Sequence, residues 1–234
     1  MRAEVAVPAY LAETYWWAYV DPRAVKLFER EWLVNLILWG NFGRLRDAAL
    51  DALGSPLEGR TLQVACVYGD LTPRLASRIA QGGRLDVVDV LPVQLQNLAR
   101  KLTRHTEVQL IHGDSATLPQ QSASYDRALL FFLLHEQPEE VRRKTIAEAL
   151  RVVKPGGRLV IVDYHRPRAW NPLYWPMVGV LRTLEPFAMD LWEHEIAEWL
   201  PAGQGLRKQT FFGGLYQLVT LTVGDNAGHA DRPG

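Results

Sequence analysis

The chain has 234 residues, 48% of them apolar, and its 26 basic side chains balance 26 acidic ones. This length and composition suit one globular domain with appendages. Binding of nucleic acid rests on clustered positive charge, so the zero net charge argues against that class of partner. The single cysteine, Cys66, excludes an internal disulfide and indicates a reducing compartment.

The first residues do not read as a secretory signal, because Glu4 and Glu13 interrupt them. No segment approaches the roughly 18 apolar residues that cross a bilayer. We therefore expect a cytoplasmic protein, with peripheral contact to the inner face of the membrane left open. Its oligomeric state is left open as well.

Residues 1–58 are expected to form a helical cap on the substrate side of the protein. Apolar residues recur at helical spacing from Val25 to Trp39, which predicts a helix over residues 24–38. All eight tryptophans lie in the flanks of the chain, at Trp16, Trp17, Trp32, Trp39, Trp170, Trp175, Trp192 and Trp199. Indole suits the wall of a ligand path or a membrane interface, and it also fills gaps where helices pack on a sheet. Both interpretations stay open.

Residues 59–223 alternate short β-rich runs with helical stretches, which predicts a doubly wound, mostly parallel α/β sheet of the Rossmann-like type with tryptophan-rich helical flanks. The region 167–203 is expected to be a helical insertion, and 224–234 a disordered tail. Gly213 and Gly214 predict a turn between the last two strands. Strands are predicted at 61–66, 84–89, 108–112, 127–133, 158–163, 208–212 and 216–223, and helices at 73–81, 92–104 and 139–153.

The segment LQVACVYGDLT, residues 62–72, stands where a nucleotide-binding glycine loop is expected. It resembles the loop of class I S-adenosylmethionine-dependent methyltransferases, which reads roughly LDVGCGTG. Aligned on that loop, the acid becomes Gln63, two glycines become Ala65 and Val67, and only Gly69 remains. Glycines let such a loop approach its ligand closely. Because Gln63 is neutral, one negative charge that would stabilise the ammonium group of the cofactor is missing.

Two strand ends carry the clearest cofactor signals. Asp89 follows the second predicted strand, where an acid accepts hydrogen bonds from ribose hydroxyls, and Val90 follows it. The alternative is a solvated aspartate at a strand end. Residues 112–119 resemble the GDAxxLP segment of these methyltransferases, which places Asp114 and Ser115 at the adenine. With so unusual a loop, Asp114 is alternatively a metal ligand.

Histidines stand at the ends of the next two strands. His135 is followed by Glu136, and His165 follows Asp163 and Tyr164. Active groups gather at the carboxyl ends of parallel strands, so both histidines are expected to face one crevice. Imidazole there acts as a base, a metal ligand or an orienting group.

Two stretches carry a family resemblance: PAYLAETYWWAYVDPRAVKLFEREWLVNLILWGN, residues 8–41, and VACVYGDLTPRLA, residues 64–76. Together they resemble the rhodoquinone-biosynthesis family, which is related to the ubiquinone and menaquinone methyltransferases. The resemblance covers nearly the whole chain. It implies conversion of ubiquinone to rhodoquinone, in which an amino group replaces a ring methoxy group. S-adenosylmethionine then serves as the amino donor, together with Mn²⁺.

The expected site combines the class motifs with this resemblance. Asp114, His135 and Tyr68 are expected to be catalytic, with Asp114 and His135 also binding the metal. The expected cofactor contacts are Gln63, Val67, Tyr68, Gly69, Asp89, Val90, Asp114 and Ser115. Two alternatives remain: a plain quinone methyltransferase whose loop has drifted, and a non-catalytic quinone-binding accessory protein.

Overall fold

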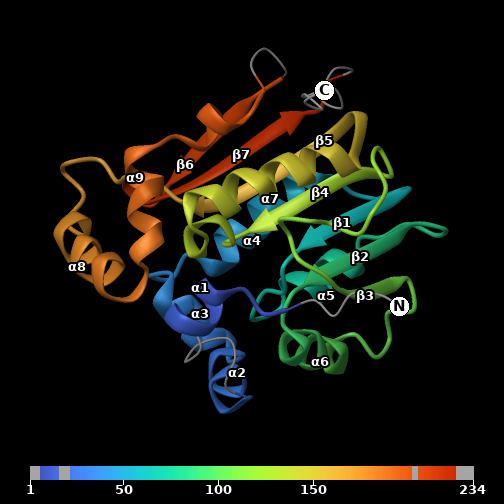
Figure 1. Cartoon of the computed structure of the whole chain (residues 1–234), viewed down its shortest axis with the longest axis horizontal. Coiled ribbons are helices and arrows are strands. Elements are labelled where there is room, and N and C mark those ends of the chain that lie inside the picture. The colour runs from blue at the N-terminus through green and yellow to red at the C-terminus, as the bar shows by residue number, and fades with distance from the viewer. Residues whose placement is uncertain (1–5, 16–21, 202–204, 225–234) are drawn as a thin grey trace.

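The structure, a computed structural model, describes residues 6–15, 22–201 and 205–224. The predicted tail and two of the tryptophans, Trp16 and Trp17, lie outside these ranges. Within them a seven-stranded sheet has the order β3-β2-β1-β4-β5-β7-β6 (Figure 1). Its strands are β1 (Arg60–Val64), β2 (Arg84–Asp89), β3 (Val108–His112), β4 (Tyr125–Phe131), β5 (Val153–Tyr164), β6 (Arg207–Phe211) and β7 (Tyr216–Thr222).

The first five strands run parallel, and β7 and β6 add an antiparallel edge. Apolar side chains are buried on both faces of the central strands, as parallel sheets require. Helices α4 (Phe42–Leu53), α5 (Leu71–Ala76) and α6 (Pro92–Lys101) pack on one face, and α7 (Glu139–Val152) packs on the other. The predicted doubly wound α/β class is confirmed.

The strand order reverses beside β1, because the chain passes from β1 outward to β3 and then returns to β4. The carboxyl ends of parallel strands diverge at such a point and leave a crevice. Helices α1 (Ala9–Thr14), α2 (Pro22–Phe28) and α3 (Glu31–Ile37) lie at the end to which the arrows of β1 and β4 point (Figure 1). The N-terminal flank therefore covers the crevice.

Two further helices, α8 (Tyr174–Leu184) and α9 (Asp190–Glu193), lie between β5 and β6. Short 3₁₀ helices occupy Leu134–Glu136, Pro186–Met189, Ile196–Trp199 and Phe212–Gly214. Gly213 and Gly214 have positive φ angles of 63° and 91°, which confirms the predicted turn before β7. In the described part of the chain, no helix is both long and apolar enough to span a bilayer.

Several predicted boundaries were wrong. The single helix expected over 24–38 is divided into α2 and α3, with Arg30 in an extended conformation between them. The preceding Glu29 accepts hydrogen bonds from Gly69 and Lys101, so a tertiary contact interrupts the helical pattern. Helix α5 ends at Ala76, well before the predicted end, and β4 already begins at Tyr125.

Helix α7 ends at Val152, close to the predicted end at residue 153, and the sequence Lys-Pro-Gly-Gly of residues 154–157, typical of a helix stop, follows it. Strand β5 begins at Val153, directly after α7, and runs through these residues. Gly156 adopts a φ of 77°, and its N–H donates to the carbonyl of Val223. Pairing with the sheet therefore overrides the local proline and glycine preference for a loop.

Candidate active site

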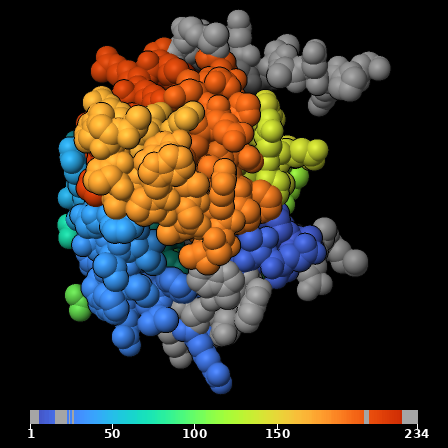
Figure 2. All heavy atoms as spheres, turned by 90° about the vertical axis from the view of Figure 1, so that its left-hand side faces the viewer, coloured from blue at the N-terminus to red at the C-terminus, as the bar shows by residue number. Residues whose placement is uncertain are grey.

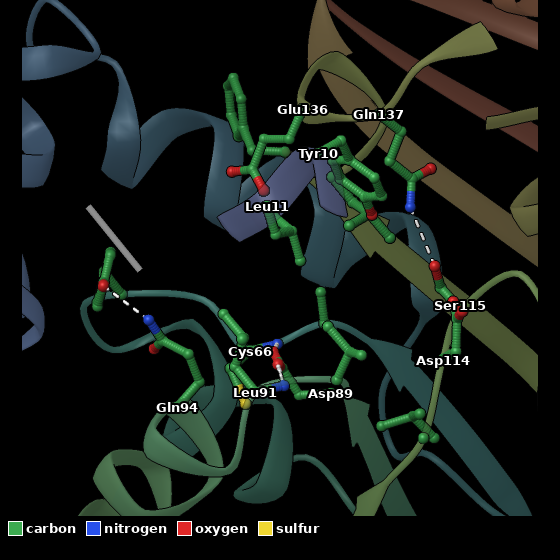
Figure 3. A pocket seen from close by; sticks show the side chains of 17 residues that line it. Tyr10, Leu11, Cys66, Asp89, Leu91, Gln94, Asp114, Ser115, Glu136 and Gln137 are labelled. Carbon is green, nitrogen blue, oxygen red and sulfur yellow. Dashed lines mark hydrogen bonds between the residues drawn. The ribbon is translucent and has the colours of Figure 1, made fainter. Parts of the chain in front are cut away.

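Two adjoining cavities occupy the crevice at the carboxyl ends of the strands. The first has a volume of about 60 Å³ and is lined by the segments after β1, β2, β3 and β4 and by α1 (Figure 3). Tyr10 and Leu11 of α1 lie across this cavity from Cys66, Asp89 and Leu91 (Figure 3). Because ligand pockets usually measure about 300–1,000 Å³, α1 leaves too little room for a nucleoside. We therefore expect α1 to move when a nucleoside cofactor binds.

Asp89 ties two loops of this cavity together. Its Oδ2 accepts the N–H of Cys66 and its Oδ1 the N–H of Leu91, each at 2.7 Å. Burial raises the pKa of this carboxyl group, and the two donated hydrogen bonds oppose that rise. A carboxylate offers about four acceptor sites, so lone pairs remain for a ligand hydroxyl. Asp89 thus has the position and chemistry of a ribose acceptor.

The loop after β1 has a strained backbone at Ala65, where the class loop has a glycine. Ala65 has a φ of 70°, a left-handed conformation that disfavours a side chain by roughly 1 kcal/mol. At the retained Gly69, with a φ of 79°, an added Cβ would lie 2.9 Å from the Phe42 ring. Gly69 also donates its N–H to Glu29 at 3.2 Å. Packing against α4 therefore explains why this glycine is needed.

Gln63 lies beneath the loop and lines neither cavity. Its side chain is fully buried, and its Nε2 donates to the carbonyl of Ala65 at 2.9 Å. The expected direct contact with the cofactor has no support in this geometry. Gly69 also lines neither cavity, whereas Val67 lines the second.

The remaining expected cofactor residues, Tyr68, Asp89, Val90, Asp114 and Ser115, line the first cavity. The Tyr68 hydroxyl accepts a hydrogen bond from Gln94 at 2.7 Å, and its ring stacks on Phe28. Burial raises the pKa of Tyr68, which keeps its phenol neutral. Tyr68 can therefore position a ligand by hydrogen bonding and shape.

The second cavity is larger and mainly apolar. It has a volume of about 580 Å³ and lies between α2, α3, α8 and the ends of β4 and β5. Four residues line both cavities: Cys66, Tyr68, Phe132 and Glu136. Phe132 has a φ of 53°, which is rare for a bulky residue, and the rings of Tyr164 and Tyr216 pack edge-on against it. Such strained residues concentrate at functional sites, and Phe132 stands where the two cavities meet.

His135 supplies a buried positive charge to the second cavity. Its Nδ1 lies 2.9 Å from Oδ1 of Asp163, and its Nε2 lies 3.8 Å from Oε1 of Glu136. Burial by itself lowers the pKa of His135, but the charge and hydrogen bond of Asp163 outweigh it, and the pKa rises to about 9. The side chain is therefore an imidazolium near neutral pH. Asp163 is held in place by the N–H groups of Leu134 and Tyr164.

The donor set does not fit a metal ion as it stands. Asp114 lines the first cavity, where its Oδ1 accepts the N–H of Ala116, and His135 lines the second. An imidazolium has no lone pair for a metal. Among the described residues, no three His, Cys, Asp or Glu side chains gather to hold one. The metal role of Asp114 and His135 remains a prediction without structural support.

His165 does not face the crevice with His135, so that expectation was wrong. Its ring contacts the carbonyl of Gly214 at 2.7 Å, Glu195 at 3.2 Å and Lys208 at 2.8 Å. It lines neither of the two cavities. The backbone N–H of His165 also donates to the carbonyl of Leu215, so the residue is bound to the turn before β7.

Several site residues carried no recognisable signal in the sequence. Asp163 was noted at a strand end, but its pairing with His135 depends on the neighbouring strands β4 and β5. Glu185, which follows α8, lines the second cavity, and burial raises the pKa of its carboxyl group. Tyr10 reaches the first cavity from α1, where its hydroxyl bonds to Gln137. Each comes from a distant segment without a motif.

One of the described tryptophans lines a cavity and others fill gaps between packed elements, so each of the two interpretations applies to part of the set. Trp39 lines the second cavity, whereas Trp192 is buried in the core. Trp199 packs under the guanidinium groups of Arg142 and Arg143. Trp32, Trp170 and Trp175 are exposed.

Solved structures define the class to which this architecture belongs. A SAM-dependent methyltransferase from Aquifex aeolicus aligns over 87% of this chain and 98% of its own, with a TM-score of 0.55 and 18% identity. An O-methyltransferase family protein from Burkholderia thailandensis aligns over 87% of this chain and 60% of its own, with a TM-score of 0.64 and 14% identity. The fold is that of the class I S-adenosylmethionine-dependent methyltransferases.

Sequence comparison gives the family. Residues 61–157 match the methyltransferase domain family. A demethylmenaquinone methyltransferase of Beutenbergia cavernae is 30% identical over 180 residues, which cover 71% of this chain and 70% of the relative. Another, of Bacillus licheniformis, is 28% identical over 176 residues, covering 71% and 75%. The chain belongs to the S-adenosylmethionine-dependent methyltransferase family that includes these proteins.

Proposed function

We propose that this protein is an S-adenosylmethionine-dependent transferase that modifies the ring of a lipophilic quinone. The observation that carries the proposal is the apolar cavity of about 580 Å³, which adjoins the cofactor cavity and has the His135 imidazolium in its wall. A ring with an apolar tail suits such a lining, and its oxygens suit a few fixed polar groups. The names of the relatives support a quinone substrate.

His135 is placed to stabilise negative charge on a ring oxygen. Because Asp163 holds Nδ1, the proton on Nε2 is the one available to a substrate oxygen. A fixed donor in a dry cavity stabilises developing negative charge more strongly than water does. Glu185, whose buried carboxyl group has a raised pKa, is suited to accept the proton of a ring hydroxyl.

Methyl transfer is the reaction that the relatives favour. S-adenosylmethionine, when bound, supplies an electrophilic methyl group. The chain supplies the ribose acceptor Asp89 on one side and the apolar cavity on the other. Phe132 and Tyr68 line both cavities, so they stand where the two substrates would meet and exclude water from the reacting atoms. For this reaction the ring is the reduced, nucleophilic hydroquinone.

Amination is a second candidate, favoured by the charges around the strained loop. Lys101 donates to the carbonyl of Gly69 at 2.8 Å and pairs with Glu29 at 2.6 Å, so its ammonium compensates the charge of this acid, which contacts the loop. With Gln63 neutral as well, a nearby amine is held less firmly in its charged form, and a neutral amine is a nucleophile. Its addition to an oxidised ubiquinone ring would release methoxide, which leaves as methanol with a proton of the amine. The carbon–nitrogen bond to the rest of the cofactor would then have to break, which leaves the amino group on the ring as in rhodoquinone. The resemblance of residues 8–41 and 64–76 to the rhodoquinone family supports this candidate.

Isotope labels distinguish the two reactions. The protein is incubated with S-adenosylmethionine labelled with ¹³C in its methyl group or with ¹⁵N in its amino group, and with a short-chain quinone in its oxidised or reduced form. Mass spectrometry of the product should show ¹³C for methyl transfer, or ¹⁵N with loss of methanol for amination. No label in any product would contradict both and leave the non-catalytic binding protein.

A histidine pair provides the matched control. His135→Gln should lose most of the turnover, whereas His165→Gln should keep it, because His165 lines neither cavity. Equal losses in the two variants would contradict the role of His135.

A further inference from the structure

Large apolar side chains are exposed on α2, α3 and α8, and Figure 2 shows the N-terminal helical segments (blue) adjoining the segment around α8 (orange) on one side of the molecule. Trp32 of α3 is 60% exposed and Trp175 of α8 is 77% exposed. We call this set the apolar face. Its members are Leu27, Trp32, Leu36, Ile37, Trp39, Trp175, Val180 and Leu184.

The apolar face is continuous with the second cavity. Leu36 and Ile37 of α3, and Val180 and Leu184 of α8, are exposed and also line that cavity. Trp39 does the same, and its Nε1–H donates to Sδ of Met177 at 3.3 Å, which joins the two helices at the mouth. The cavity therefore opens through a ring of apolar side chains rather than through a polar rim. A ligand with a long apolar tail could extend outward without meeting water only if an apolar medium covered this ring.

The segments that form the apolar face carry positive charge, although the chain has none overall. Residues 22–37 and 166–185 contain six basic side chains, Arg23, Lys26, Arg30, Arg166, Arg168 and Arg182, and three acidic ones, Glu29, Glu31 and Glu185. Glu29 pairs with Lys101, and Glu31 lies 3.7 Å from Arg46. Arg30, Arg168 and Arg182 are exposed in these segments, and anionic headgroups attract basic residues near a membrane surface.

We propose that the apolar face docks on an anionic lipid bilayer, with the mouth of the second cavity turned toward the hydrocarbon. Exposed indoles suit the headgroup level, and arginines beside them bind lipid phosphate. The helices would lie on the bilayer without crossing it. A protein partner would instead favour a patch whose core is depleted of charge and whose rim is polar.

The test uses the full chain with vesicles that contain neither quinone nor S-adenosylmethionine, so that it is independent of the proposed reaction. Flotation is measured with vesicles of phosphatidylcholine alone and with vesicles that also contain phosphatidylglycerol. The protein should partition onto the anionic vesicles about tenfold more strongly, and about 0.5 M salt should remove most of this difference.

Two matched variants locate the surface. Trp32→Ser combined with Trp175→Ser should weaken partitioning about tenfold or more, because both indoles are exposed. Leu206→Ser, which removes an exposed apolar side chain before β6, should leave partitioning unchanged. Neither tryptophan lines a cavity, so the double variant should keep its melting temperature and its turnover of a short-chain, water-soluble quinone.

Equal partitioning of the wild type and the double variant would overturn the proposal. So would an absence of binding to anionic vesicles, or a concentration-dependent dimer in sedimentation that the double variant abolishes. The last result would assign the face to a second copy of the chain. Loss of turnover with intact vesicle binding would count against the proposed function alone.

Discussion

The charge of His135 is set by its contacts at the scale of single residues. Asp163 is fully buried and receives backbone N–H groups on the same carboxylate that holds the imidazole. Two interactions compete at His135, since burial favours the neutral ring and the carboxylate favours the charged one. The carboxylate prevails, so a pKa of about 9 results at a site where burial alone would lower it.

We expect the reaction rate to fall as pH rises through about 9, because His135 then loses its proton. The same charge stabilises the folded protein fully below the unfolded pKa near 6.5, and this contribution is lost as pH rises through about 9. Asp163→Asn should lower the pKa of His135, because burial is then opposed only by the charges of Glu185 and Glu136. The measurement is the pH–rate profile together with NMR titration of the imidazole nitrogens. A descending limb that stays near pH 9 in Asp163→Asn would exclude His135 as its source.

At the scale of elements, α1 decides whether the cofactor cavity is open. Leu11 within this helix and Tyr15 directly after it are buried with Leu91, and Tyr10 and Leu11 line the cavity. A helix of six residues has little stability of its own, so tertiary contacts hold it in place. We therefore expect α1 to act as a removable cover of the first cavity.

Weakening α1 should speed cofactor entry. Ala12 is exposed, and Ala12→Gly should weaken the helix by about 1 kcal/mol, which corresponds to roughly fivefold more frequent opening. The association rate of S-adenosylhomocysteine, followed by tryptophan fluorescence in stopped flow, should rise by a similar factor. Ala147→Gly makes the same change at an exposed position of α7 and should leave this rate unchanged. An unaltered rate in Ala12→Gly would show that α1 does not limit entry.

At the scale of the whole molecule, the sheet brings the cofactor loops together. Asp89 links the loops after β1 and β2 at their carboxyl ends, while Asp126 pairs with Lys154 near the start of β4. A ligand that binds at the carboxyl ends of β1 and β2 should therefore stabilise the folded chain. A substitution near the start of β4, at the other end of the strands, should not change this effect of the ligand.

S-adenosylhomocysteine at about 100 times its dissociation constant should stabilise the protein by about 2.7 kcal/mol and raise the melting temperature by roughly 5–10 °C. Asp89→Ala should lose about 1–3 kcal/mol of ligand affinity and most of this rise, because the ribose loses a charged acceptor. Asp126→Ala should lower the melting temperature without ligand but keep the rise. Differential scanning calorimetry measures both. An Asp89→Ala protein that responds as fully as the wild type would remove Asp89 from the cofactor site.

Local patterns in the sequence were enough for the α/β class, the strands and the cofactor loops. Alternation of β-rich runs with helical stretches determines a parallel sheet, because its strands are buried on both faces. Asp89 and Asp114, both singled out at strand ends, line the first cavity because strand ends converge in this topology, and their roles toward a cofactor stay predictions. The sequence also shows that Ala65 and Val67 replace two glycines of the class loop.

Only the tertiary structure decided which side chains meet. The pairing of His135 with Asp163, the cover formed by Tyr10 and the apolar cavity all join segments far apart in the chain. Gln63 stands at a motif position where a cofactor contact was predicted, yet its side chain bonds to the carbonyl of Ala65 beneath the loop. The direction of a strand side chain follows from the register of the strand and not from the residue type. Periodicity reports which face of an element is buried, whereas a charge on a buried histidine depends on a partner that sequence spacing does not reveal.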